Sequence, residues 1–233
     1  MMARRSRRLA TRAQGKVGGM RVIVFPGVLR PPSDSALLGA VLARHAGDLA
    51  GRTAVDLCSG TGILGLTAAR LGARATAVEI SRRAVACARL NARLNRLALE
   101  VLRGDLFEPL RGRRFDLIVS NPPYIPAPPG NTPRGPVRAW DAGPDGRVFI
   151  DRICDGAAEH LRPGGRVLLV QSSLARPEQT MRRLAERGVA PAIVAEHVGK
   201  LGPVAYERFD YLRALGVADD SLAERMVVVE GCV

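Results

Sequence analysis

The chain has 233 residues, of which 47% are hydrophobic and 24% charged, and its mean hydropathy is close to zero. This length suits one large domain with its own core. The apolar content excludes an intrinsically disordered protein, and no apolar run approaches the ~18 residues that a membrane span needs. The net charge is 35 − 22 = +13, but 33 of the 35 basic residues are arginine. That bias points to an arginine-rich genome rather than to chosen nucleic-acid contacts.

Cysteine and histidine usage bounds the compartment and the chemistry. The four cysteines form no CxxC pair, and the three histidines are equally dispersed: Cys58, Cys87, Cys154, Cys232, His45, His160 and His197. This pattern predicts neither a disulfide framework nor a zinc site, and we expect no metal. It suits a reducing compartment, so we expect a cytoplasmic protein.

The first 19 residues differ from the rest of the chain. Residues 1–19 carry six basic side chains and no acid, and no apolar segment follows them, so they are no secretory signal. Their composition loosely resembles an organelle transit peptide. We expect a flexible basic arm or an over-extended start, because Met20 directly precedes the first strand-like run at 21–25. Residues 20–233 are expected to form a single domain.

Helical and strand-like patterns alternate from residue 33 onward. The expected helices are 33–50, 63–71, 82–95 with Ser81 as its cap, 146–161, 177–187 and 204–215. The expected strands are 53–58, 75–79, 99–102, 115–119, 166–171, 192–198 and 225–230. This order predicts an α/β fold with a seven-stranded, mostly parallel, doubly wound sheet. The Pro/Gly-rich stretch 122–146 is long for a connection, and such loops are usually functional.

A glycine-rich loop follows the first buried strand, in the run Asp56-Leu-Cys-Ser-Gly-Thr-Gly-Ile-Leu-Gly65. Gly60 and Gly62 allow a sharp turn and let a ligand approach the N-terminus of the next helix without a Cβ in the way. Together with Gly65 they match GxGxxG, so a dinucleotide-binding fold must be considered.

Three acids at successive strand ends separate the possible ligands. Asp56 would repel a pyrophosphate and attract the ammonium group of a methionine. Glu79 can accept hydrogen bonds from two ribose hydroxyls, and Asp105 is placed to accept from an adenine amino group. These acids favour S-adenosylmethionine (SAM) over NAD.

The tetrapeptide Asn121-Pro122-Pro123-Tyr124 follows the fourth strand. Methyl transfer to a planar –NH2 is difficult because the nitrogen lone pair is delocalised. Two acceptors that hold both N–H bonds can direct that lone pair at the methyl group. Asn121 offers its side-chain carbonyl and Pro122 its backbone carbonyl, while the two prolines make the pair rigid. Tyr124 can stack on the planar group, and no general base is needed.

These segments together resemble a known enzyme family. The runs VDLCSGTGILGL, AVEIS, GDLFEPL, NPPYIP, AWDAGPDGR and LRPGGRVLLV are similar to class I SAM-dependent methyltransferases, and within them to the HemK/PrmC protein-glutamine N5-methyltransferases. The resemblance covers residues 31–171. It implies that Asp56, Gly60 and Gly62 hold the methionine end of SAM, Glu79 the ribose, and Asp105 with the Leu106 backbone the adenine. It also implies that residues 121–124 hold the target amide, bordered by a Pro-x-x-Asp-Thr-like segment containing Asp34.

Two departures concern the substrate and the cofactor site. Only about 50 residues precede the glycine loop, so the helical N-terminal domain of the bacterial enzymes is missing. The chain resembles instead the short branch, whose members act on a class I release factor with a small zinc-binding partner. Leu106 stands where an aromatic side chain often covers the adenine. We therefore expect a glutamine N-methyltransferase acting on a translation release factor.

Three other functions compete with this one. An exocyclic-amine methyltransferase acting on adenine or cytosine in RNA or DNA could use the same NPPY chemistry, with the basic arm on phosphates. No separate base-recognition domain is visible, although flipped-base pockets usually need one. An inactive SAM-binding module is disfavoured by the intact Asn121 and Tyr124. A dehydrogenase is disfavoured by Asp56 and by NPPY itself.

Overall fold

The computed structural model describes residues 13–31, 33–44, 49–130 and 139–233. Seven strands form one sheet in the order β5-β4-β3-β6-β7-β9-β8. The first five are parallel, and β9 runs antiparallel to both of its neighbours. Their bounds are β3 Thr53–Leu57, β4 Arg74–Glu79, β5 Leu99–Arg103, β6 Phe115–Ser120, β7 Leu161–Ser172, β8 Ala190–Lys200 and β9 Ala223–Cys232. The mostly parallel seven-stranded sheet is confirmed.

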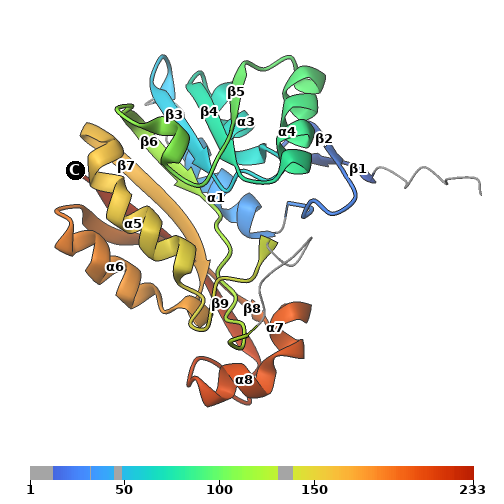
Figure 1. Cartoon of the computed structure of the whole chain (residues 1–233), viewed down its shortest axis with the longest axis vertical. Coiled ribbons are helices and arrows are strands. Elements are labelled where there is room, and N and C mark those ends of the chain that lie inside the picture. The colour runs from blue at the N-terminus through green and yellow to red at the C-terminus, as the bar shows by residue number, and fades with distance from the viewer. Residues whose placement is uncertain (1–12, 32, 45–48, 131–138) are drawn as a thin grey trace, which may run out of the picture.

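Helices cover both faces of this sheet (Figure 1). The helices α1 (Ser33–Arg44), α3 (Ile63–Arg70) and α4 (Arg82–Asn95) lie on one face, and α5 (Val148–His160) and α6 (Pro177–Glu186) lie on the other. Two 3₁₀ helices follow strands of the sheet: η1 (Glu108–Leu110) comes after β5, and η3 (Ser173–Ala175) comes after β7. Apolar strand residues point alternately to the two faces and build two cores, one against α1 and α3 and the other against α5 and α6. No helix of the described segments is long and apolar enough to cross a membrane.

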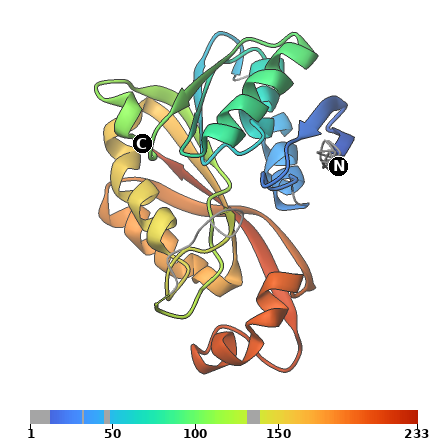
Figure 2. The same cartoon turned by 45° about the vertical axis from the view of Figure 1, so that its right-hand side comes forward.

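A small lobe extends from the end of the sheet. It consists of α7 (Pro203–Glu207) and α8 (Phe209–Ala214), inserted between β8 and β9, and it projects at the bottom of Figures 1 and 2. The single helix expected at 204–215 is therefore wrong. The helix is interrupted at Arg208, which has φ −110° and ψ 15°. Its side chain forms an ion pair of 2.5 Å with the buried Asp141 and donates to the Pro126 carbonyl at 3.0 Å.

The N-terminal region differs from the expected arm. Ala13–Val17 (β1) pairs antiparallel with Met20–Val24 (β2), forming a two-stranded sheet of its own. The turn between them is Gly18-Gly19, and both residues have positive φ. That conformation is typical of a two-residue hairpin. Residues 13–17 of the segment expected to be an arm therefore form a strand, and residues 1–12 lie outside the described residues.

One helix start differs from the sequence prediction, and one expected helix end lies outside the described residues. The helix expected from residue 146 begins at Val148, and the one expected to end near residue 50 leaves the described residues after Arg44. The expected helix 82–95 is confirmed, with the Ser81 hydroxyl accepting from the Ala84 N–H at 3.4 Å. Local patterns therefore predicted element identity well and element ends less well.

Candidate active site

A cavity of about 720 Å³ lies at the carboxyl edge of the parallel strands. Its walls come from the ends of β3, β4, β5 and β6, together with residues 27–31 and the start of α5. The strand order reverses at β3, and ligands of open α/β sheets bind at such a switch point. The volume lies in the range of small-molecule sites. The structure thus brings the predicted cofactor residues of three strands to one hollow.

Asp56 is a buried acid in the cavity wall. Its carboxylate is 1% exposed, and one oxygen accepts from the Gly65 N–H at 2.8 Å. The other oxygen has no hydrogen-bond partner among the described residues. Burial raises the pKa of Asp56 to about 8, against the Gly65 bond and assisted by the negative charge of Glu79. A buried oxygen without a partner at a cavity fits a cationic ligand group.

Gly60 and Gly62 have different structural roles in the glycine loop. Gly60 lines the cavity, has φ +53°, and a Cβ there would meet nothing within 4 Å, so a ligand can approach its backbone. Gly62 does not line the cavity. It has φ +80°, and a Cβ on it would lie 3.0 Å from the Ala88 Cβ of α4. Gly62 therefore allows α3 and α4 to pack closely, whereas only Gly60 faces the space that the sequence predicted for a ligand.

Glu79 ends β4, and its carboxylate binds the backbone of the glycine loop. One carboxylate oxygen accepts from the Gly60 N–H at 2.9 Å and the other accepts from the Ser81 N–H at 2.8 Å. The side chain lines the cavity. An ionised carboxylate has about four lone-pair positions, so two remain for hydroxyl donors.

Asp105 has a partner that the sequence did not reveal. Arg152 of α5 forms a two-pronged pair with it, with bonds of 3.2 and 2.9 Å, and both residues line the cavity. Leu106, next along the chain, is 5% exposed and has φ +48°, a conformation that is strained for a side chain of this size. The fixed turn presents Leu106 and Asp105 to the same cavity wall.

Asn121 lines the cavity at the end of β6, and α1 holds its side chain. Its Nδ2 donates to the Ser35 hydroxyl at 3.1 Å, and Ser35 also lines the cavity. With the nitrogen fixed on Ser35, the side-chain carbonyl of Asn121 remains to accept a hydrogen bond. Sequence reasoning missed Ser35, although it stands next to Asp34 in the segment that was expected to border the site.

The other three residues of NPPY and its neighbourhood are placed differently. Pro123 lines the cavity, whereas Pro122, Tyr124 and Asp34 are absent from its described wall. The Tyr124 hydroxyl donates to the Asp34 carboxylate, and Asp34 is 8% exposed. Burial, together with the Asp34 charge, raises the pKa of Tyr124. Asp34 therefore fixes Tyr124 away from the described cavity wall. Pro32 lies outside the described residues.

The end of the Pro/Gly-rich stretch wraps around the NPPYIP backbone. The Ile125 N–H donates to the Trp140 carbonyl at 2.9 Å, and the Ala127 N–H donates to the Gly143 carbonyl at 2.9 Å. Gly146 has φ +77°, and a Cβ on it would lie 2.4 Å from the Tyr124 carbonyl oxygen. Only glycine fits this approach, so the run AWDAGPDGR serves as a clamp on NPPY.

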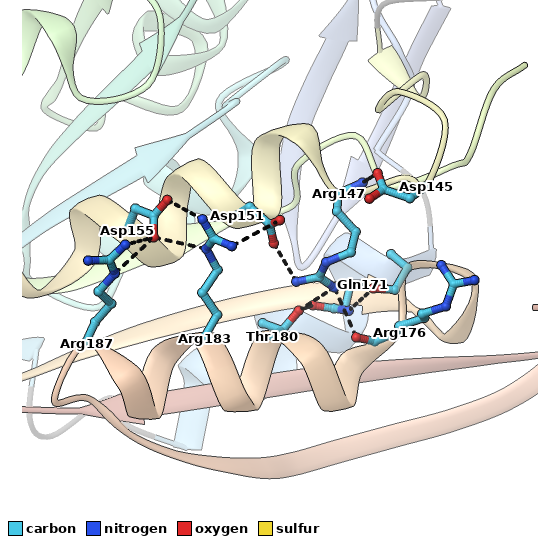
Figure 3. A network of polar contacts seen from close by, with 10 residues as sticks. Asp145, Arg147, Asp151, Asp155, Gln171, Arg176, Thr180, Arg183 and Arg187 are labelled. Carbon is cyan, nitrogen blue, oxygen red and sulfur yellow. Dashed lines mark hydrogen bonds and ion pairs between the residues drawn. The ribbon is translucent and has the colours of Figure 1, made fainter. Parts of the chain in front are cut away.

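A buried arginine anchors this clamp to the rest of the domain (Figure 3). The Arg147 side chain is 3% exposed and pairs with Asp151 at 2.6 Å. It also donates to the Thr180 hydroxyl at 3.1 Å and to the carbonyls of Ala175 and Arg176. Thr180 in turn donates to the buried Gln171 at 2.8 Å. The network joins β7, α5 and α6, and it holds the loop that holds NPPY.

Comparison with known proteins identifies the class. Residues 33–128 match the family model of the methyltransferase small domain. The fold matches a chain of the E. cuniculi Mtq2–Trm112 complex, which is described as responsible for methylating the eRF1 termination factor. The TM-score is 0.62, with 23% identity over 89% of this chain and 99% of that one. Fold and cavity define a class I SAM-dependent methyltransferase.

Relatives in sequence identify the family. A putative protein N5-glutamine methyltransferase of Methanocaldococcus jannaschii is 32% identical over 77% of this chain and 90% of that protein. A release factor glutamine methyltransferase of Geobacter sulfurreducens is 33% identical over 76% of this chain, which spans 64% of the length of that relative. The chain belongs to the HemK/PrmC family of protein-glutamine N5-methyltransferases. It is a SAM-dependent N-methyltransferase, and the family resemblance seen in the motifs is confirmed.

Proposed function

We propose that this enzyme methylates the side-chain amide nitrogen of a glutamine in a peptide chain release factor. The observation that carries the proposal is Asn121, fixed through its nitrogen on Ser35 at the wall of the cavity. Its side-chain carbonyl is thereby left to accept from an amide N–H. The names of the two sequence relatives support a glutamine acceptor, and one of them names the release factor.

The cofactor residues follow from the cavity wall. We propose that Asp56 and Gly60 receive the methionine end of SAM, since the Asp56 carboxylate has a buried oxygen without a partner. Glu79 then accepts from the ribose, and Asp105 with the Leu106 backbone receives the adenine. We assign Gly62 an indirect role, because its packing against Ala88 sets the start of α3.

The protein's part in the reaction is to hold the acceptor. When bound, SAM supplies an electrophilic methyl group on its sulfonium. Asn121 accepts one N–H of the target amide and the Pro122 carbonyl accepts the other, which turns the nitrogen lone pair out of conjugation. Pro123 and Tyr124 keep this pair rigid, with Tyr124 anchored on Asp34. Once the methyl group has been transferred, the amide nitrogen would release one of its two protons to water, so no base is needed before attack. The described residues that line the cavity include neither His nor Lys.

The partner and the location are part of the same proposal. A small zinc-binding activator subunit is proposed because the short branch works with one and because the E. cuniculi structure is a complex with Trm112. We place the enzyme in the cytoplasm, where release factors act. A nucleic-acid acceptor is the second candidate. It is supported by the NPPY chemistry, which also suits an exocyclic amine, and by the basic composition of residues 1–19, whereas the two sequence relatives above are named for protein substrates.

The test compares acceptors and variants in one assay. Transfer of tritiated methyl from SAM is measured with recombinant release factor and with total RNA from the same organism. We expect label in the release factor, and we expect Asn121→Ala to lose 10²-fold or more of the rate while its affinity for SAM stays unchanged.

Two further variants order the contributions. Asn121→Asp keeps an acceptor and should retain measurable turnover, and Ser35→Ala should lie between it and the wild type because Asn121 is then no longer fixed. Label in RNA alone would favour the nucleic-acid reading. Wild-type turnover in Asn121→Ala would show that NPPY is only a turn.

A further inference from the structure

A row of side chains on α4 carries the N-terminal strand. Asn91 and Asn95 are four residues apart and so lie on one face of the helix. The side chain of Asn95 accepts from the Arg21 N–H at 2.9 Å and donates to the Arg21 carbonyl at 2.8 Å. Asn91 does the same for Ile23, with bonds of 2.9 and 3.0 Å. In Figures 1 and 2 the β1–β2 hairpin lies beside α4.

The reason for this row is the open edge of β2. Within the described residues β2 pairs with β1 alone, so the backbone groups of its other edge need partners. An asparagine amide offers one carbonyl and two N–H donors, and it therefore copies the pairing of a neighbouring strand. Asn91 and Asn95 act as that neighbour for Ile23 and Arg21.

Asn91 makes two bonds that have no counterpart at Asn95, one to the Cys87 sulfur on α4 and one to the glycine loop. Its second N–H donates to the carbonyl of Thr61 at 3.1 Å, and its side chain is fully buried. Thr61 stands between Gly60 and Gly62 in the glycine loop, and it lines the cavity. The bonds of the Asn95 side chain go instead to Arg21 and to the Asn91 carbonyl. One buried amide thus joins the N-terminal strand to the cofactor loop.

Both ends of this connection belong to the cavity wall. The chain that leaves β2 reaches residues 27–31, which line the same cavity as the glycine loop. Arg83, two turns before Asn91 on α4, donates to the Pro26 carbonyl at 2.8 Å and fixes the start of this segment. At the other end, the Gly60 N–H next to Thr61 is bound to Glu79.

We propose that Asn91 is a positioning residue for the cofactor, which holds the glycine loop and the segment 27–31 at a fixed separation. The cavity is then assembled before SAM enters, and SAM in turn stabilises the hairpin through the same amide. This inference rests on the SAM-dependent activity of the chain and is independent of the acceptor.

The first test is a comparison of Asn91→Ala with Asn95→Ala. Each variant removes a two-pronged tie to β2, but only Asn91→Ala frees Thr61. Titration calorimetry with S-adenosylhomocysteine should show about a tenfold rise in Kd for Asn91→Ala, the size of one net hydrogen bond, and less than a twofold rise for Asn95→Ala. The KM for SAM should rise in parallel for Asn91→Ala, with kcat at saturating SAM close to the wild-type value. Equal affinities in the two variants would overturn the proposal.

The second test needs no variant and remains decisive if Asn91→Ala does not fold. Ile23 does not line the cavity, so a bound ligand reaches it only through the protein. Hydrogen exchange of the Ile23 amide in the wild-type protein should slow several-fold when S-adenosylhomocysteine is added. Asn95→Ala should keep this response. An Ile23 amide whose exchange ignores the ligand in the wild type would refute the coupling.

Discussion

Replacing Asp56 by asparagine should separate the stability of this fold from its cofactor binding. The carboxylate is buried, and one of its oxygens has no partner among the described residues. Asparagine has nearly the same shape, and its carbonyl can still accept from the Gly65 N–H. The substitution therefore removes a buried charge while leaving the packing of β3 against α3 almost unchanged.

The size of the effect follows from the pKa of Asp56. Burial raises that pKa from 3.8 to about 8. Between these two values the unfolded chain is ionised and the folded protein is protonated at this site, so folding takes up a proton. The free energy of unfolding must then fall as pH rises, by about 1.4 kcal/mol for each pH unit and by about 6 kcal/mol in all. The penalty is complete above pH 8 and absent near pH 4.

The assay is urea unfolding of both proteins at several pH values from 5 to 9. Other groups titrate in this interval, but they do so equally in the two proteins and cancel in the difference. We expect Asp56→Asn to gain stability relative to the wild type as pH rises, until the difference levels off above pH 8. Calorimetry at pH 7.5 should show that the variant binds SAM more weakly, because the ammonium group of SAM loses a partner that can carry a negative charge.

Proton linkage gives a second signature in the wild type. A cationic ligand group favours the ionised form of Asp56, so binding should release a proton and the affinity should rise with pH between 6 and 7.5. The ligand's own amino group limits the rise near pH 8. A stability difference that stays constant from pH 5 to 9 would refute the assignment of the buried charge, and unchanged affinity would refute its role in binding.

The remaining predictions concern side chains that support the site. Tyr124→Phe removes the bond to the buried Asp34, and we expect a loss of about 1.5–3 kcal/mol in urea unfolding with only a mild loss of turnover. Arg147→Met removes the ion pair with Asp151 and the bonds of a buried guanidinium to Thr180 and to the carbonyls of Ala175 and Arg176, and it should cost about 3–5 kcal/mol. Arg187→Met, whose partner Asp155 is reached at the surface, should cost less than about 1 kcal/mol. Similar losses in the two arginine variants would show that the network in Figure 3 does not anchor the loop.

The parts of the fold that could be predicted depend on local patterns. The helix at 82–95 was placed with its cap, because Ser81 and the following apolar periodicity are neighbours in the sequence. The parallel strands were found because each is a short apolar run bounded by polar residues or glycine. The strand ends of β3, β4 and β6 then had to meet at one edge, which is why Asp56, Glu79 and Asn121 were expected together.

The parts that were missed depend on contacts between distant residues. Arg152 is 47 positions from Asp105, and Ser35 is 86 positions from Asn121, so no local pattern links either pair. The late start of α5 follows from Gly146, which is held against the Tyr124 carbonyl and cannot enter the helix. Among these missed features, β1 alone has a local signal in the sequence. Gly18-Gly19 between two short strand segments predicts a hairpin turn.

The carboxylates of the site show how one group can serve both the fold and a ligand. Glu79 already accepts from two backbone N–H groups, and Asp105 already holds Arg152. These bonds do not exhaust a carboxylate, since each oxygen has two lone pairs. They fix its orientation before a ligand arrives, so that little conformational entropy is lost on binding. Asp56 differs, because one of its oxygens is buried without a hydrogen-bond partner among the described residues, and burial disfavours the ionised form. The ionised form of Asp56 lowers the stability of the empty fold, and a bound cation offsets that cost. Replacing Asp56 should therefore raise the free energy of unfolding and lower the affinity for the cationic ligand.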